Sequence, residues 1–226
     1  GTGKWSAIAA MDENDPLTLI TEAVYARLLS ALYPERIKAA SLYSGKLKVE
    51  SGKLSDNAQL SIEDVRQALY AAKLISYAQG FSLLRHASEH YGWDLDYGTI
   101  ARIWRKGCII RSVFLQKITE AYRKDPDLEN LLFDDFFHTK IQEALPAWRR
   151  VVAEGALSGV ALPAMSSALN YFDGLRTLYS AANMIQAQRD YFGAHTYERT
   201  DRERGHFFHT NWTGEGGNTV SGTYSV

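Results

Sequence analysis

Apolar residues recur every three or four positions along most of the chain, which is the spacing of one face of an α-helix. The longest such run predicts a helix over residues 61–91 that ends at Gly92. Ser61 followed by Asp64 resembles a capping box, in which the two residues bind each other's backbone N–H groups. At about 1.5 Å per residue this helix would be a rod of roughly 45 Å, and we expect it to form the spine of the domain.

Two faces of the predicted spine carry apolar side chains, which is typical of a helix packed on more than one side. The first face is made of Ile62, Val65, Leu69, Ala72 and Ile75. The second face is made of Leu74, Tyr77, Phe81 and Leu84.

The rest of the chain is also dominated by helical spacing. Asp15 followed by Pro16 predicts a helix start, since aspartate is a good cap and proline suits the first helical position. Further helices are predicted over about 97–105, 109–124, 128–133, 136–154, 163–175 and 181–192, with a polar loop over 45–57. No run alternates convincingly with period two, so strands are expected to be few or absent and the fold class is all-α.

A weak internal repetition is present. The segment AAKLI at 71–75 resembles AANMI at 181–185, and the apolar helices near Pro16 and Pro163 both open beside a proline. These matches predict an internally duplicated helical unit, although alanine-rich helices also match by chance.

Beyond Gly193 no periodic segment could build a core, yet the remainder is unlike a flexible linker. It is rich in aromatic residues, namely Tyr197, Phe207, Phe208, Trp212 and Tyr224. Linkers are poor in aromatics because they have too little apolar surface to offset the entropy of ordering. We therefore expect a helical domain over 1–193 and an extended tail over 194–226 that docks on another surface.

Composition narrows the function classes. The chain has 226 residues, 46% of them hydrophobic and 23% charged, and a net charge of −1, so it has no global attraction to nucleic acid or an anionic membrane. No apolar run approaches 18 residues, and the single Cys108 fits a reducing, cytoplasmic compartment. The start at Gly1, without a methionine or a targeting pattern, leads us to expect a piece of something larger.

The sequence lacks the dinucleotide-binding glycine fingerprint, the phosphate-binding loop of nucleotide hydrolases and the nucleophile elbow. His86 and His90 fit the H-x-x-E-H pattern of zinc hydrolases. The alternative, which we favour, is a pair of histidines that complements the helix dipole at a helix end. We therefore expect neither a metal site nor a self-contained catalytic site.

Arg189 and His195 flank the predicted end of the helix over 181–192. Arginine and histidine donors at such a corner would suit a phosphate or carboxylate, and an ordinary helix end with a basic residue explains them equally well. Arg27 by itself is most simply a surface arginine.

Several longer motifs are more specific. The segments QAQRDYFGAHTY at 186–197, HTNWTG at 209–214, ISYAQGF at 75–81, GCIIRS at 107–112 and GTGKW at 1–5 cover essentially the whole chain. Together they resemble the 6-phosphogluconate dehydrogenases, the decarboxylating enzymes that use NADP.

This resemblance implies an all-helical domain with a duplicated helical unit and a C-terminal tail, preceded in the family by a Rossmann domain that this chain lacks. The family oxidises 6-phosphogluconate with NADP and releases CO₂ to leave ribulose 5-phosphate. Its catalytic lysine and glutamate have no counterpart here, so no catalytic residue is expected in this chain, and the chain alone is expected to be inactive.

Carried over by motif, Arg189 and His195 match a pair that binds substrate in the partner subunit's site of a homodimer, and Arg27 matches a further substrate-binding arginine. The stretch Ser221, Gly222, Thr223 and Tyr224 corresponds to one near the partner's NADP, a weaker correspondence. Residues 11–15 and 198–204 depart from the usual family pattern, and His86 and His90 are not family features. The competing interpretation is a non-catalytic helical module whose tail clasps a partner protein.

Overall fold

The computed structural model describes residues 1–43, 60–105, 109–212 and 214, and they divide into two compact units, Gly1–Asp173 and Gly174–Val226. The predicted all-α class is confirmed, because helices dominate the described residues and the only strands among them form one two-stranded sheet. The predicted division into a helical domain over 1–193 and a docking tail over 194–226 stays a prediction. The predicted internal duplication also stays a prediction. The predicted loop over 45–57 lies outside the described residues.

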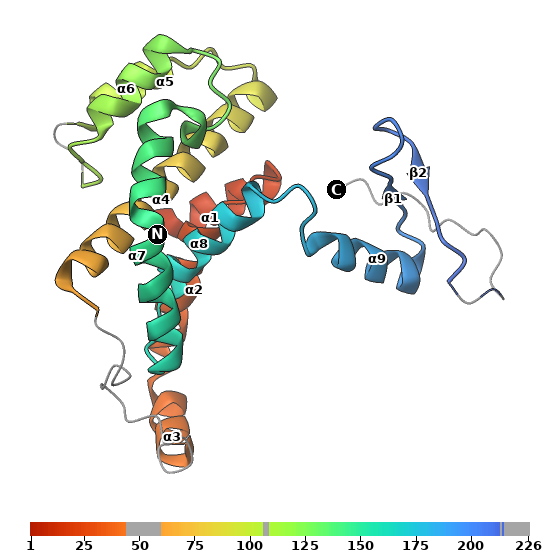
Figure 1. Ribbon diagram of the computed structural model, residues 1–226, viewed down its shortest axis with the longest axis horizontal. Coiled ribbons are helices and arrows are strands. Elements are labelled where there is room, and N and C mark those ends of the chain that lie inside the picture. The colour runs from red at the N-terminus through yellow and green to blue at the C-terminus, as the bar shows by residue number, and fades with distance from the viewer. Residues whose placement is uncertain (44–59, 106–108, 213, 215–226) are drawn as a thin grey trace. The chain divides into compact units, whose positions relative to one another are not determined.

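The first unit begins with three helices, α1 (Thr2–Asp12), α2 (Thr18–Ala31) and α3 (Tyr33–Tyr43). It continues with α4 (Ile62–Tyr91), α5 (Tyr97–Trp104), α6 (Leu115–Lys124), a single 3-10 turn η1 (Leu131–Phe133), α7 (Asp135–Leu157) and α8 (Pro163–Leu175), whose last residues lie in the second unit. Figure 1 shows α4 and α7 side by side and α5 against α6. None of the helices in the described ranges has the length and apolar run that a bilayer span requires.

Helix α4 is the predicted spine, and its start follows the predicted capping box. The Ser61 hydroxyl accepts a hydrogen bond from Asp64 N at 3.0 Å, and Ser61 N donates to the Asp64 carboxylate at 2.9 Å. The helix ends where Gly92 takes a left-handed conformation with φ 65°, which glycine adopts without steric cost.

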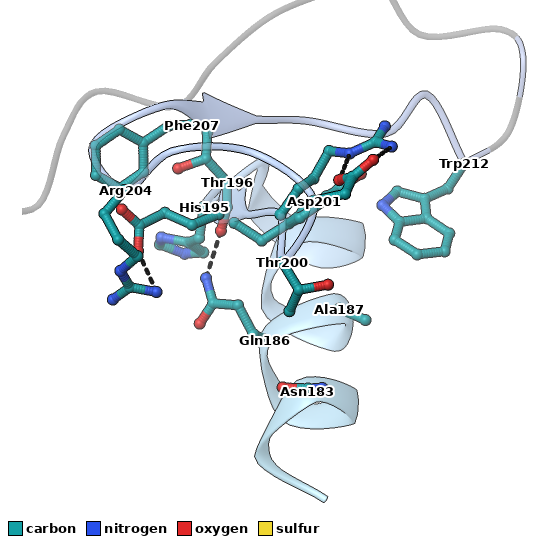
Figure 2. Close-up of a pocket in the computed structure, with 13 residues that line it drawn as sticks. Asn183, Gln186, Ala187, His195, Thr196, Thr200, Asp201, Arg204, Phe207 and Trp212 are labelled. Carbon is teal, nitrogen blue, oxygen red and sulfur yellow. Dashed lines mark hydrogen bonds and ion pairs between the residues drawn. The ribbon is translucent and has the colours of Figure 1, made fainter. Parts of the chain in front are cut away.

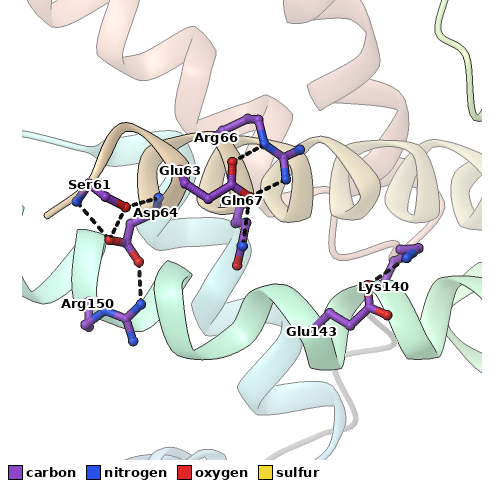
Figure 3. A network of polar contacts seen from close by, with 8 residues as sticks. All are labelled: Ser61, Glu63, Asp64, Arg66, Gln67, Lys140, Glu143 and Arg150. Atoms are coloured by element: carbon purple, nitrogen blue, oxygen red, sulfur yellow. Dashed lines mark hydrogen bonds and ion pairs between the residues drawn. The ribbon is translucent and has the colours of Figure 1, made fainter.

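Helix α7 packs along α4 and closes the core. Trp148 of α7 is fully buried, as are Phe81 of α4 and Phe137 of α7. At one end of this contact Arg150 donates to the Asp64 carboxylate, which ties α7 to the first turn of α4 (Figure 3). The capping box and the helix packing therefore meet at one carboxylate.

The prediction that both apolar faces of α4 are covered is confirmed for the second face and wrong for three of the five residues of the first, Ile62, Val65 and Leu69. Ile62 is 91% exposed and Leu69 61%, while Ile75 is fully buried. No element of the described residues covers the first turns on that side, although the sequence makes them apolar.

Three predicted helix starts are corrected. Helix α6 begins at Leu115 rather than at residue 109, and the segment predicted over 128–133 shortens to η1, where the Asn130 side chain accepts from Leu132 N at 3.0 Å. Helix α2 begins at Thr18, so Asp15 is not its cap. Asp15 instead accepts a hydrogen bond from Ser82 Oγ at 2.7 Å, so its carboxylate binds α4 rather than the start of α2. Helices α1 and α3 were not predicted, because their apolar positions follow no single face.

The second unit contains α9 (Ala182–Gly193) and the sheet of β1 (Tyr197–Glu198) and β2 (Phe207–Phe208). The strands are antiparallel, with Tyr197 opposite Phe208. Two of the aromatic residues that were expected to dock the tail on another surface, Tyr197 and Phe208, therefore face each other across the strands of this unit.

Candidate functional site

Arg27 lies on α2, whose start is held by a side chain from the spine. Gln79 of α4 is fully buried, accepts from Leu19 N at 3.1 Å and donates to Thr18 Oγ1 at 2.9 Å. The first N–H groups of a helix have no partner within it, so Gln79 acts as a cap supplied by another helix. Helix α2 is therefore fixed to the core at the end opposite Arg27.

Helices α1 and α2 approach each other closely beside Arg27. A side-chain carbon on Gly3 would lie 2.9 Å from the Val24 side chain, so glycine is needed for this approach. The two helices line a cavity of about 720 Å³ to which Lys4, Asp12 and Arg27 contribute charge. Arg27 is exposed, and its guanidinium is accessible to an anionic ligand in this cavity.

Arg189 and His195 lie at the C-terminal end of α9, as the sequence predicted. Arg189 is exposed and its Nη1 donates to Gln186 Oε1 at 3.2 Å. His195 is half-buried, and a side-chain carbon added to Gly193 would lie 3.0 Å from His195 Nε2. The imidazole therefore lies against the last turn of α9 in a space that only glycine leaves open.

His195 lines a cavity of about 620 Å³ within the second unit (Figure 2). Arg199 and Arg204 line it too and are engaged with carboxylates, Arg199 with Asp201 at 2.7 Å and Arg204 with Glu198 at 2.8 Å. The hydrogen bond from Arg199 lowers the pKa of Asp201 to about 2. Arg189 does not line this cavity, and Arg27 lines the separate one of the first unit.

The structure adds a residue that sequence reasoning missed. Asp190 is fully buried, and its carboxylate accepts four hydrogen bonds. The donors are Thr196 N at 2.9 Å, His209 Nδ1 at 2.9 Å, Thr210 N at 3.0 Å and Trp212 Nε1 at 2.9 Å. Burial alone would raise the pKa of Asp190, but these hydrogen bonds outweigh it and hold the pKa below its ordinary value.

The backbone on either side of His195 is strained. Ala194 has φ 50° and Thr196 φ 60°, a left-handed conformation that is rare for residues other than glycine and most unusual for a β-branched one. Both peptide groups of Thr196 are fixed, because its N–H donates to Asp190 and its carbonyl accepts from the Gln186 side chain. Figure 2 shows Gln186 reaching Thr196 beside the His195 ring.

In the structure, His86 and His90, the two residues of the zinc interpretation, each pair with a carboxylate instead. His86 Nδ1 lies 2.8 Å from Asp15, and His90 Nδ1 lies 2.9 Å from Glu13. The two imidazoles thus tie the end of α4 to the segment after α1 through separate carboxylates. Among the residues that the structure describes, no group of three histidine, cysteine or acidic side chains is arranged to hold a metal. The stretch 221–224, predicted to approach a cofactor, lies outside those residues.

Comparisons with known proteins agree on one family. A family model described as 6-phosphogluconate dehydrogenase, C-terminal domain, matches residues 1–212. The decarboxylating 6-phosphogluconate dehydrogenases of Aggregatibacter actinomycetemcomitans and Rattus norvegicus are each 52% identical to the chain over 226 residues, and that of Homo sapiens is 51% identical. The alignments cover all of this chain and 46% of each relative, so the chain spans about half their length.

A solved structure gives the same result. The 6-phosphogluconate dehydrogenase of Plasmodium falciparum, described in its apo form and in complex with NADP⁺ and with 6-phosphogluconate, superposes with a TM-score of 0.85 at 41% identity. The superposition covers 94% of this chain and 44% of that one. The chain therefore belongs to the 6-phosphogluconate dehydrogenase family.

Proposed function

We propose that this chain is the helical, substrate-binding and dimerising part of a decarboxylating 6-phosphogluconate dehydrogenase. The enzyme would convert 6-phosphogluconate and NADP⁺ into ribulose 5-phosphate, CO₂ and NADPH. The observation that carries the proposal is the joint position of Arg189 and His195 at one helix end, in a chain 52% identical over its whole length to enzymes of that name. A cytoplasmic location is part of the same proposal and is supported by the single cysteine.

Arg27, Arg189 and His195 would recognise the anionic groups of the substrate. A guanidinium offers paired N–H donors that match phosphate or carboxylate oxygens, and an imidazole adds a donor whose strength rises on protonation. Desolvating a phosphate is costly unless several donors replace its water. Binding and orienting the sugar phosphate is thus the task of these side chains, and they transfer no proton or hydride.

NADP, when bound, would supply the acceptor for the hydride that leaves carbon C3 as the C3 hydroxyl group is oxidised to a ketone. The described residues do not fit a dinucleotide, because they contain no strand followed by a glycine-rich turn and a helix, the arrangement that cradles a pyrophosphate. We therefore propose that NADP is held chiefly by a part of the full-length enzyme outside this chain, with Ser221, Gly222, Thr223 and Tyr224 near the partner's cofactor. For the same reason the chain alone should have no turnover.

A homodimer would complete the site. Large apolar side chains are exposed on α2, on α3, between these two helices and on the first half of α4, among them Leu28, Leu29, Leu32, Ile37, Leu42, Ile62 and Leu69. Many exposed large apolar side chains on neighbouring stretches of a chain are typical of a protein interface. We propose that these faces pack against the same faces of a second copy and that the tail over 194–226 reaches the partner's substrate site.

The proposal is tested by Arg189→Ala in the full-length enzyme. Losing a charged donor should raise the KM for 6-phosphogluconate about tenfold or more and leave the KM for NADP unchanged. Arg202→Ala, an exposed arginine of the same unit, is the matched control. An unchanged substrate KM in Arg189→Ala would favour the competing non-catalytic interaction module.

A further inference from the structure

Asp190 stands between the two residues proposed to bind substrate, yet it cannot reach a ligand itself, because it is fully buried. It lies in the last turn of α9, where a helix dipole disfavours negative charge. Burial adds a second penalty, since a carboxylate loses its hydration. Because both the helix dipole and burial disfavour the charge of Asp190, other interactions must stabilise the carboxylate at this position.

The carboxylate of Asp190 binds two segments of the chain, one around His195 and one over residues 209–212. Oδ1 accepts from Thr196 N, directly after His195, and from His209 Nδ1. Oδ2 accepts from Thr210 N and Trp212 Nε1. One side chain thus fastens both the His195 segment and the returning tail to the end of α9.

The His195 segment needs this fastening because its backbone is strained on both sides of the imidazole, at Ala194 and Thr196. Without the bond to Asp190, Thr196 would relax toward the ordinary negative φ of a β-branched residue. The peptide between residues 195 and 196 would then rotate, and the imidazole would move with it.

Gln186 completes the arrangement from one turn earlier in α9. Its Nε2 donates to the Thr196 carbonyl, and its Oε1 accepts from Arg189 Nη1 at 3.2 Å. The same amide therefore touches both the strained segment and the Arg189 guanidinium, so that the orientations of Arg189 and His195 are linked.

We propose that Asp190 is a positioning residue, which with Gln186 holds His195 in a strained, preformed orientation toward the phosphosugar and ties the tail segment over 209–212 to the same point. This inference rests on the proposed substrate role of Arg189 and His195. It assigns to Asp190 a task that is distinct from substrate contact, because all four of its partners belong to the protein.

The test uses the full-length enzyme carrying Asp190→Asn, which keeps the shape of the side chain. The amide group can accept through only one of its two polar atoms, so about half of the four hydrogen bonds are lost. The KM for 6-phosphogluconate should rise about tenfold, while kcat falls less than about threefold and the KM for NADP stays constant. Glu203→Gln, an exposed carboxylate of the same unit, should change none of these values. A drop in kcat or in the active fraction without a change in substrate KM would overturn the inference and indicate a merely structural residue.

His195→Ala and the double variant separate this inference from the proposed function. If Asp190 acts through His195, then Asp190→Asn should add less than about twofold to the KM of His195→Ala, because coupled residues are not additive. Full multiplication of the two effects would overturn the positioning role and leave the substrate role of His195 intact. An unchanged KM in His195→Ala itself would instead overturn the proposed function.

Gln186→Ala provides the same test should the Asp190 variant not fold, since alanine favours the helix. It should raise the substrate KM about threefold or more by releasing Thr196 and Arg189 together. A wild-type KM in this variant would contradict the linked orientation.

Discussion

At the end of α9, the missing side chain of Gly193 leaves the space that the His195 ring occupies. Gly193→Ala would place a carbon 3.0 Å from Nε2 and 3.1 Å from Cδ2 of that ring. Because Gly193 has helical backbone, alanine should stabilise the helix by about 1 kcal/mol or less while displacing the imidazole. We therefore expect the KM for 6-phosphogluconate to rise about fivefold with no loss of thermal stability, measured by steady-state kinetics and thermal unfolding of the full-length enzyme.

Gly174→Ala is the matched control for this prediction. An added carbon at Gly174 meets no atom within 4 Å, so the substrate KM should stay at its wild-type value. Equal KM values for the two alanine variants would mean that the packing of His195 on the helix end has no part in substrate binding.

Single residues were predictable where a motif carries them and unpredictable where tertiary partners define them. Arg189 and His195 follow from the segment over 186–197, and both lie at the helix end as expected. Asp190 is in the same segment, but its partners come from residues 196–212, and periodicity contains no information on such contacts. One available signal was the acidic residue itself, because a carboxylate in a last helical turn needs donors to be stable there.

At the scale of elements, the start of α4 makes the structure sensitive to acid. The hydrogen bonds from Ser61 N, from the Ser61 hydroxyl and from Arg150, in that order, lower the pKa of Asp64 from 3.8 to about 2. A carboxyl group whose pKa is lower in the folded state stabilises the fold above its unfolded pKa, and this contribution disappears as the pH falls through the folded value. The contribution of Asp64 should therefore be complete above about pH 5, mostly lost by about pH 2 and absent below the folded pKa.

Asp64→Asn tests this directly. The difference in Tm between wild type and variant, followed by circular dichroism, should be largest at neutral pH and shrink as the pH falls from about 5 to about 2. Asp94 is exposed and lies outside the helices, so the Tm difference between wild type and Asp94→Asn should not depend on pH. A constant Tm difference between pH 2 and pH 7 for Asp64→Asn would contradict the role of its charge.

The helices themselves were predicted well where one amphipathic face is long and capped. Helix α4 and helix α8 begin and end within one residue of their predicted bounds, because Ser61, Gly92 and Pro163 are strong local signals. The predicted start of α2 was wrong because a tertiary contact decided it. Asp15 is used by Ser82 of α4, and the start of α2 is capped by Gln79, a residue 60 positions away in the sequence. Such a cap leaves no trace in the local pattern.

At the scale of the whole molecule, the sequence carries apolar residues that its own described fold does not cover. Leu29 of α2 is 62% exposed, Ile37 of α3 is 54% exposed and Leu69 of α4 is 61% exposed. Periodicity predicted a covered face for Leu69 but could not say whether the covering element belongs to the same chain. The homodimer proposed above supplies a candidate, and in that proposal the second copy would pack on the exposed faces of helices α2 to α4.

The solution mass of the chain tests this arrangement. At micromolar concentration we expect twice the mass of one chain by analytical ultracentrifugation, both for the whole chain and for a version ending at Thr196, because helices rather than the tail would form the interface. Leu29→Lys combined with Ile37→Lys should give a monomer, since burying unpaired charges in an apolar interface is strongly unfavourable. Ile103→Lys on α5, which is 64% exposed and not part of the proposed interface, should remain a dimer. A monomeric whole chain would contradict the helical interface, and a dimer lost only on shortening would assign the interface to the tail.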